Sequence, residues 1–160
     1  TRAPRPTLRS PKPLQAWSRP QADLREVAEA ARDPERLVID VRDPSRYRGE
    51  ADPFDPSPGH IPGAVNAPYA TNLGPDGRFL PAAELARKYR DLLGERAPEQ
   101  VIVACGSGVT ACHTLLAMER AGLGGAKLYV GSFSEWSRSG RAIATGDEPG
   151  TDAGSGPSDG

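Results

Sequence analysis

Two short apolar runs constrain the fold of this chain more than any other feature. They are Leu37-Val38-Ile39-Asp40-Val41 and Val101-Ile102-Val103-Ala104, both rich in β-branched residues and as short as single strands. A strand with one solvated face alternates apolar and polar residues, whereas an almost unbroken run indicates burial on both faces. The chain must therefore supply helices for both sides of a sheet that contains these strands.

Segments with helical periodicity lie between and around these runs. Apolar residues recur at helical spacing in four segments, at 24–31, 81–93, 109–121 and 133–136. Two more short apolar runs, at 64–66 and 128–130, are candidates for further strands. Strands that alternate with helices predict a parallel sheet, because parallel strands need a crossover connection. The predicted fold class is α/β, with a small parallel sheet flanked by helices on both faces.

The distribution of apolar residues divides the chain into three parts. They are concentrated in residues 14–145, which predicts one compact domain there. Residues 1–13 are rich in proline and carry four basic residues, which is typical of a linker or tail. Residues 146–160 are mostly glycine, serine, proline and acidic residues, a composition typical of a disordered tail.

Charge, hydropathy and cysteine content exclude several kinds of partner. The chain has 20 basic and 21 acidic residues, well interleaved, so no nucleic-acid partner is expected. No apolar run approaches the roughly 20 residues of a membrane-spanning helix, so no membrane partner is expected. Two cysteines are too few for a disulfide framework and indicate a reducing, cytoplasmic setting. Neither a metal nor another cofactor is expected, because the two cysteines and two histidines match no zinc pattern.

The segment after the second apolar run carries the strongest candidate for chemistry. Cys105 follows that run directly, and Gly106-Ser107-Gly108 connects it to the predicted helix. Ligands of parallel sheets bind beyond the carboxyl ends of the strands, where this loop lies. Glycines let backbone N–H groups point inward, and a helix N-terminus favours an anion. The loop therefore suits a thiolate nucleophile or a persulfide better than the alternative, a packed structural cysteine.

Cys112 has a different setting. It lies inside the predicted helix, on the face shared with Val109 and Leu116, so we expect it in the core. A resolving or redox-sensing partner of Cys105 is the alternative reading.

Four segments, taken together, resemble a known family. They are Asp40-Val41-Arg42 with Ser45-Arg46-Tyr47-Arg48-Gly49, then Gly59-His60-Ile61-Pro62-Gly63-Ala64-Val65-Asn66, Cys105-Gly106-Ser107-Gly108-Val109-Thr110 and Gly131-Ser132-Phe133-Ser134-Glu135-Trp136. In this order they resemble the rhodanese superfamily of sulfurtransferases. The likeness is to the C-terminal catalytic module of 3-mercaptopyruvate/thiosulfate sulfurtransferases.

The resemblance implies an enzyme and assigns roles within it. The domain at 14–145 would move sulfane sulfur from 3-mercaptopyruvate or thiosulfate to a thiol or cyanide through a Cys105 persulfide, without a cofactor. Its partners would be a small anionic sulfur donor and a thiol or thioredoxin-like acceptor. The residues matching the family's substrate-binding positions are Arg46, Gly106, Ser107, Gly108, Val109 and Thr110. A guanidinium at Arg46 suits a donor carboxylate, which it binds through two hydrogen bonds.

Further matched residues are expected to support the site. Asp40 and Arg42 would brace the loops beneath it. Structural or packing roles are expected for His60, His113, Glu135 and Trp136.

Two features depart from the family's pattern. Many 3-mercaptopyruvate enzymes have a second arginine at the position that Asp55 occupies here, and a carboxylate there weakens the binding of an anion. The family usually pairs two modules in tandem, and this chain resembles the active second one, so an N-terminal rhodanese module is a further expected partner.

The loop Gly106-Ser107-Gly108 carries no positive side chain, whereas thiosulfate-preferring relatives usually place basic residues there. This neutral loop favours 3-mercaptopyruvate as the donor.

Two rival functions remain to be weighed. Phosphatases and arsenate reductases with a related cysteine loop need an arginine six residues after the cysteine, and Ala111 stands there. The second rival is a non-catalytic rhodanese module that acts as a regulatory or protein-binding domain. Such modules often lack the cysteine, so Cys105 argues for the enzyme.

Overall fold

The computed structural model describes residues 20–50 and 58–151 of the 160-residue chain. The predicted linker at 1–13, Asp55 and residues 152–160 of the predicted tail lie outside the described residues. Within the described part, strands and helices alternate as the apolar pattern predicts.

A parallel sheet of five strands forms the centre of the described domain. The strands are β1 (Gln21–Ala22), β2 (Leu37–Asp40), β3 (Val65–Asn66), β4 (Val101–Ala104) and β5 (Lys127–Tyr129). Their order is β1-β5-β4-β2-β3, and every neighbouring pair is parallel. The two strands predicted first, β2 and β4, are adjacent and buried at every position. The predicted α/β fold with a parallel sheet is therefore confirmed.

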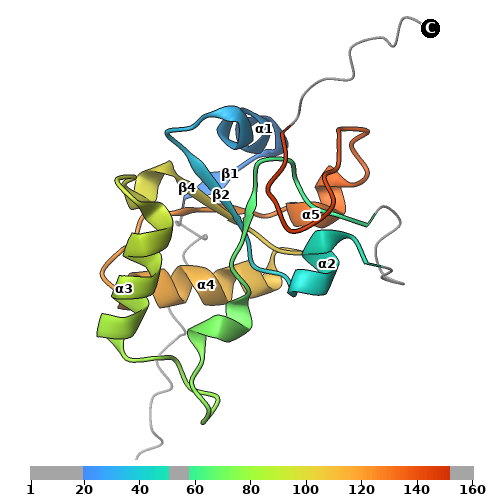
Figure 1. Cartoon of the computed structure of the whole chain (residues 1–160). Helices are drawn as coiled ribbons and strands as arrows, with labels where there is room; N and C mark the ends of the chain where they lie inside the picture. The colour runs from blue at the N-terminus through green and yellow to red at the C-terminus, as the bar shows by residue number, and fades with distance from the viewer. Residues whose placement is uncertain (1–19, 51–57, 152–160) are drawn as a thin grey trace, which may run out of the picture.

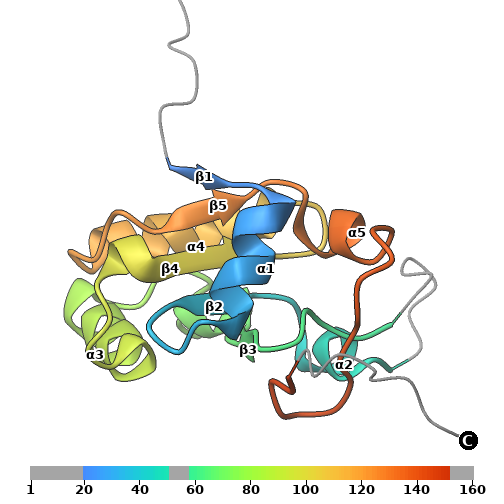
Figure 2. The same cartoon turned by 90° about the horizontal axis from the view of Figure 1, so that it is seen from above.

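Helices cover both faces of this sheet. Those described are α1 (Leu24–Arg32), α2 (Pro44–Arg48), α3 (Ala82–Leu93), α4 (Val109–Arg120) and α5 (Ser132–Trp136), with short 3-10 helices η1 (Tyr69–Asn72) and η2 (Pro98–Gln100). Figure 1 shows α1 above the sheet and α3 and α4 below it, and Figure 2 shows α1 crossing the strands from above. Two separate apolar cores result, one under α3 and α4 and one under α1 and α5.

Local sequence explains where the longer helices form. Asp23 precedes α1, and its side chain accepts a hydrogen bond from the Glu26 backbone N–H at 2.8 Å. This bond satisfies one of the N–H groups that a helix start leaves unpaired. In α3 the side chains of Leu85, Tyr89 and Leu93 recur every fourth residue, and all three are buried against the sheet.

The structure corrects one expectation about α4. Val109 and Leu116 were expected to share a core face with Cys112, but their exposed fractions are 73% and 45%. The buried stripe of α4 lies one position round the helix, at Ala111, Thr114, Leu115 and Met118. Cys112 is partly buried at the edge of that stripe. The two stripes have similar helical spacing, i, i+3, i+7 at 109, 112 and 116 and i, i+3, i+4, i+7 at 111, 114, 115 and 118, so periodicity alone did not choose between them.

The packed domain extends beyond the boundary expected at residue 145. The Gly146 N–H donates to the Arg48 carbonyl at 2.9 Å, and the Gly63 N–H donates to the Pro149 carbonyl at 2.8 Å. Backbone groups make these contacts, so the composition of the segment gave no sign of them. No helix in the described ranges is long and apolar enough to cross a membrane.

Candidate active site

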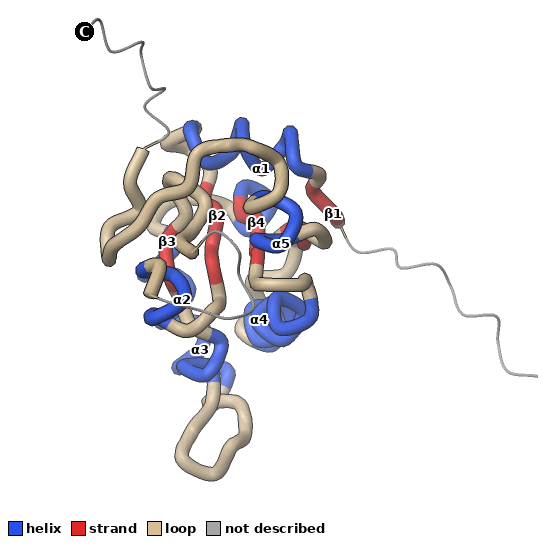
Figure 3. The backbone as a smooth tube through the Cα atoms, turned by 90° about the vertical axis from the view of Figure 1, so that its right-hand side faces the viewer, coloured by secondary structure: helices blue, strands red, loops and turns tan. Residues whose placement is uncertain are grey.

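Cys105 lies where the sequence placed it, directly after β4 at the carboxyl edge of the sheet. Figure 3 views the molecule from that side, where α2, α5 and the start of α4 surround the strand ends. The Cys105 side chain is buried, and its Sγ accepts a hydrogen bond from the Gly108 backbone N–H at 2.8 Å. Gly108 has φ of +91°, and a Cβ on it would lie 2.6 Å from the Val130 carbonyl oxygen. The amide that faces the sulfur therefore depends on a glycine.

A turn that begins α5 holds the cysteine loop from below. The Cys105 N–H donates to Ser132 Oγ at 3.0 Å, and the Phe133 N–H donates to the Cys105 carbonyl at 2.9 Å. The Gly106 carbonyl accepts from both the N–H and the hydroxyl of Ser134, at 2.9 and 2.5 Å. These four hydrogen bonds fix the backbone of the loop on either side of the sulfur.

Ser132 stands out within this turn. Its φ is +51°, a left-handed conformation that no other non-glycine residue adopts in the described ranges. Its side chain is fully buried, donates to the Tyr129 carbonyl at 2.7 Å and lies 3.8 Å from Cys105 Sγ. Such backbone strain persists where the surroundings demand it, and here it places the Ser132 oxygen where it accepts the Cys105 N–H while its proton goes to the Tyr129 carbonyl. In the sequence, Ser132 is only part of the fourth matched segment and has no assigned role.

Arg46 reaches the cysteine loop from α2. A Cβ built on Gly106 would lie 3.2 Å from Arg46 Nη2 and 3.4 Å from its Nη1. The guanidinium therefore lies against the open side of Gly106, within the loop that follows Cys105. The structure thus brings Arg46 and the loop of Cys105, both of which the resemblance assigned to the site, close together.

A stack of rings supports the helix that carries Arg46. The Tyr47 and His60 rings stack in parallel with centroids 3.7 Å apart, and His60 Nδ1 lies 2.7 Å from the Tyr47 carbonyl. His60 Nε2 lies 3.0 Å from the Pro149 carbonyl, and the Tyr47 hydroxyl donates to the Ala64 carbonyl at 2.5 Å. Burial raises the pKa of Tyr47, so the phenol keeps the proton that it donates. His60 has no exposed surface, and these contacts give it a structural role.

A buried ion pair braces the floor of the site. Arg42 donates to the Asp40 carboxylate through Nε and Nη2, at 2.7–3.1 Å, and also to the Gly59 carbonyl at 2.7 Å. Its guanidinium carbon lies 4.1 Å from the centre of the Phe133 ring. The pair therefore links the end of β2 to the turn at Gly59 and to the turn beneath Cys105.

The remaining predicted residues lie around this centre. Ser107 and Val109 are exposed, and Thr110 is partly exposed in the first turn of α4. His113 instead packs against the rings of Tyr69 and Phe79, where burial and the nearby Lys88 charge lower its pKa. Trp136 is buried in the core under α1 and α5, and Glu135 accepts a hydrogen bond from the Tyr129 hydroxyl at 2.7 Å.

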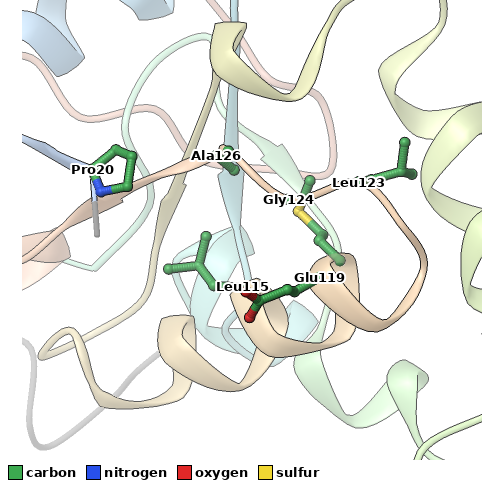
Figure 4. Close-up of a pocket in the computed structure, with 8 residues that line it drawn as sticks. Pro20, Leu115, Glu119, Leu123, Gly124 and Ala126 are labelled. Carbon is green, nitrogen blue, oxygen red and sulfur yellow. The ribbon is translucent and has the colours of Figure 1, made fainter. Parts of the chain in front are cut away.

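A well-formed hollow of about 120 Å³ lies elsewhere, at the far end of α4 (Figure 4). Pro20, Leu115, Glu119 and Ala126 are among the residues that line it. With a rise of about 1.5 Å per residue, this half of the helix lies roughly 10 Å from its start. The hollow is therefore separate from the cysteine loop.

Comparisons with known proteins agree with this arrangement. A family model described as "Rhodanese-like domain" matches residues 23–139. A Pseudomonas aeruginosa protein named "Probable 3-mercaptopyruvate sulfurtransferase" is 48% identical over 115 residues, which are 71% of this chain and 40% of that protein. A Mycobacterium tuberculosis protein named "Putative thiosulfate sulfurtransferase SseB" is 42% identical over 100 residues, which are 62% of this chain and 34% of that protein.

A solved structure gives the same picture. The 3-mercaptopyruvate sulfurtransferase from Leishmania major is 32% identical, with a TM-score of 0.57, and the match covers 73% of this chain and 32% of that one. The chain therefore spans two fifths or less of the length of each of these relatives.

Proposed function

The chain belongs to the rhodanese-like domain family, and from that premise we propose that it is a sulfurtransferase whose Cys105 carries sulfur as a persulfide. The observation that carries the proposal is the Gly108 N–H directed at Cys105 Sγ from 2.8 Å, with the Arg46 guanidinium beside the same loop. A backbone donor at the end of a strand favours negative charge on the sulfur, both as thiolate and during transfer.

In the first half-reaction the Cys105 thiolate attacks the donor's transferable sulfur, which is the thiol sulfur of 3-mercaptopyruvate or the outer sulfur of thiosulfate. An S–S bond forms at Cys105, and the bond from that sulfur to the donor breaks with its electron pair going to the leaving group. With 3-mercaptopyruvate the leaving group is the enolate of pyruvate, which takes the proton from the donor thiol. With thiosulfate it is sulfite, and no proton moves. Arg46 would hold the donor's anionic end during this step.

In the second half-reaction an acceptor removes the outer sulfur. A thiolate or cyanide attacks it, the S–S bond breaks, and the electron pair returns to Cys105 as thiolate. Both cysteines of the chain are free, which fits a reducing, cytoplasmic setting where small thiols and thioredoxin-like proteins are abundant. The Cys105 side chain is buried, so the acceptor would meet the outer sulfur rather than Sγ.

The proposal is tested by the intact mass of the reduced protein after incubation with each donor. We expect the protein to gain one sulfur atom, which a thiol reductant removes, and cyanide to be converted to thiocyanate. The rival reading, a non-catalytic regulatory or protein-binding module, requires no gain of sulfur from either donor. Such a result with fully reduced Cys105 would contradict the enzyme.

We further propose that 3-mercaptopyruvate is the better donor. The loop beside Arg46 is formed by Gly106 and the neutral Ser107, so a single guanidinium faces the donor there, which suits one carboxylate better than a compact dianion. The relatives described above include proteins named for each donor, so their names do not decide the question. A larger kcat/KM with thiosulfate would overturn the donor preference and leave the Cys105 chemistry intact.

Arg46→Ala is expected to lower kcat/KM for either donor by roughly 10- to 150-fold, because a hydrogen bond to a charged group contributes about 1.5–3 kcal/mol. The loss should fall mainly on KM, since the guanidinium binds an end of the donor that does not react. Arg48→Ala is the matched control, because Arg48 lies two residues along α2 and pairs with Glu50 and Asp147 at the surface. Steady-state kinetics measures both variants. Equal losses of kcat/KM would contradict the assignment of Arg46 to donor binding.

Ser132→Ala is expected to slow the formation of the persulfide about tenfold, because the buried Cys105 N–H loses its acceptor and the backbone beneath the sulfur is no longer fixed. KM should change little, since Ser132 lies beneath the sulfur and not toward the donor. Ser134→Ala is the control, because its hydroxyl bonds Gly106 while its N–H keeps that carbonyl satisfied. Single-turnover sulfur uptake measures both variants, and equal rates would show that the hydrogen bond from the Cys105 N–H to Ser132 has no special part in sulfur uptake.

A further inference from the structure

Lys88 on α3 is held in an unusual environment outside the cysteine site. Its Nζ donates to Thr71 Oγ1 at 2.5 Å and to Asn72 Oδ1 at 2.8 Å, both uncharged oxygens. No carboxylate in the described ranges lies within ion-pair distance of this amine. By contrast, the Lys127 amine is paired with Glu26.

The hydrogen bonds of Lys88 suit a neutral amine. An ammonium group has three protons to donate, and the described surroundings offer two oxygen acceptors. The Tyr89 ring, 5.0 Å from Nζ, gives the cation a weaker partner. A neutral amine can donate both of its protons to Thr71 and Asn72, whereas the ammonium form needs a third acceptor, which solvent supplies to this partly buried side chain.

The titratable groups around Lys88 are His113, Tyr89 and the two acidic residues of α3. His113 lies close enough for the Lys88 charge to lower its pKa, and Tyr89 donates its hydroxyl proton to Asn72. Glu84 and Asp91 lie four residues before and three residues after Lys88 on α3, and neither pairs with the amine; Asp91 lines the same hollow. Burial lowers the pKa of Lys88 to about 8, so roughly half of the amine is neutral at that pH, on the order of a hundredfold more than for an ordinary lysine.

A shallow hollow of about 540 Å³, wide open to solvent, lies beside the Lys88 side chain. Its walls come from β3, the segment that follows it and α3, and the lining residues are Asn66, Ala67, Pro68, Thr71, Lys88, Asp91 and Leu92. The volume lies in the range of small-molecule sites, and Ala67, Pro68 and Leu92 make the walls largely apolar. The Lys88 side chain therefore lines a largely apolar hollow that is large enough for a small molecule.

We propose that Lys88 is a nucleophilic amine that captures small apolar aldehydes or ketones from this pocket as imines. The Nζ lone pair attacks the carbonyl carbon, a C–N bond forms, and the carbonyl oxygen takes up a proton from nitrogen. Loss of water then gives the imine, so one amine and one carbonyl compound yield one imine and one water. Desolvated lysines with lowered pKa values are the ones that react in this way.

The test uses two aldehydes with the whole chain at pH 7.5, under a mild hydride reductant that traps imines. Benzaldehyde needs the pocket, whereas formaldehyde reports the reactivity of the amine alone. Peptide mass spectrometry compares Lys88 with Lys127 in the same sample. We expect both aldehydes to label Lys88 about tenfold faster than Lys127, with sulfur transfer unchanged by Lys88→Arg.

Leu92→Trp separates the pocket from the amine. Filling the pocket with an indole is expected to reduce labelling of Lys88 by benzaldehyde at least severalfold and to leave labelling by formaldehyde intact. If Leu92→Trp leaves the rate of Lys88 labelling by benzaldehyde unchanged, the proposal is overturned, because the pocket then plays no part. Labelling of Lys127 as fast as Lys88 would overturn it as well. Neither outcome bears on Cys105, since the residues of this pocket are not those that hold the cysteine loop.

Discussion

Cys105→Ser is expected to abolish sulfur uptake from both 3-mercaptopyruvate and thiosulfate. A serine hydroxyl takes the place of Sγ beneath the Gly108 N–H, so the loop keeps its shape while the sulfur nucleophile is lost. The measurement is the intact mass after incubation with each donor, together with thiocyanate production from cyanide. We expect no added sulfur and no thiocyanate above the uncatalysed rate.

Cys112→Ser is the matched control for this experiment. Cys112 Sγ donates a long hydrogen bond of 3.5 Å to the Gly108 carbonyl and lies partly buried at the edge of the core. Removing it leaves the Gly108 N–H and Cys105 in place, so sulfur uptake should remain close to that of the parent chain. Donor sulfur found on Cys112 by peptide mapping would contradict the assignment of the nucleophile.

Arg42→Ala is expected to lower the free energy of unfolding by about 3–5 kcal/mol, because it leaves the buried Asp40 carboxylate without its partner. The side chains of Asp40 and Arg42 are only 2% and 1% exposed, so water cannot replace the lost guanidinium. The Gly59 carbonyl loses its donor at the same time. Urea unfolding followed by circular dichroism measures the change.

Two further variants make this prediction specific to the buried pair. Arg48→Ala removes a guanidinium from a surface ion pair, so it should change stability far less. The double variant Asp40→Asn with Arg42→Met should lose less than the sum of its two single variants, because the lost attraction is counted twice in that sum. Additive losses would show that the two charges do not act as a unit.

The elements predicted from sequence are those whose signal is local. β2 and β4 are continuous apolar runs, and α3 repeats its buried residues every fourth position, so pattern alone finds them. The short α2 has Tyr47 as its one buried residue, and β1 spans only Gln21–Ala22. Neither is long enough to show a period, so both escaped prediction.

The residues of the candidate site also differ in whether local sequence predicts them. Cys105 and its glycines could be predicted because a strand, a loop and a helix follow one another in sequence. Arg46 required a family resemblance, since its approach to Gly106 joins segments far apart in the chain. The role of Ser132 depends on a left-handed φ and on hydrogen bonds to a loop 27 residues earlier, and no sequence pattern encodes these. Contacts between residues far apart in the chain are therefore what could not be predicted from the sequence alone.

The support of α2 by residues near 149 has a consequence for how the site is assembled during protein synthesis. The turn that fixes the cysteine loop is complete once Ser134 has been made. The stack beneath Arg46 is complete only when Pro149 reaches His60. At roughly 5–20 residues per second, a growing chain needs about one to three seconds to add the intervening residues. The cysteine loop can therefore acquire its backbone contacts before the helix that carries Arg46 has its full support.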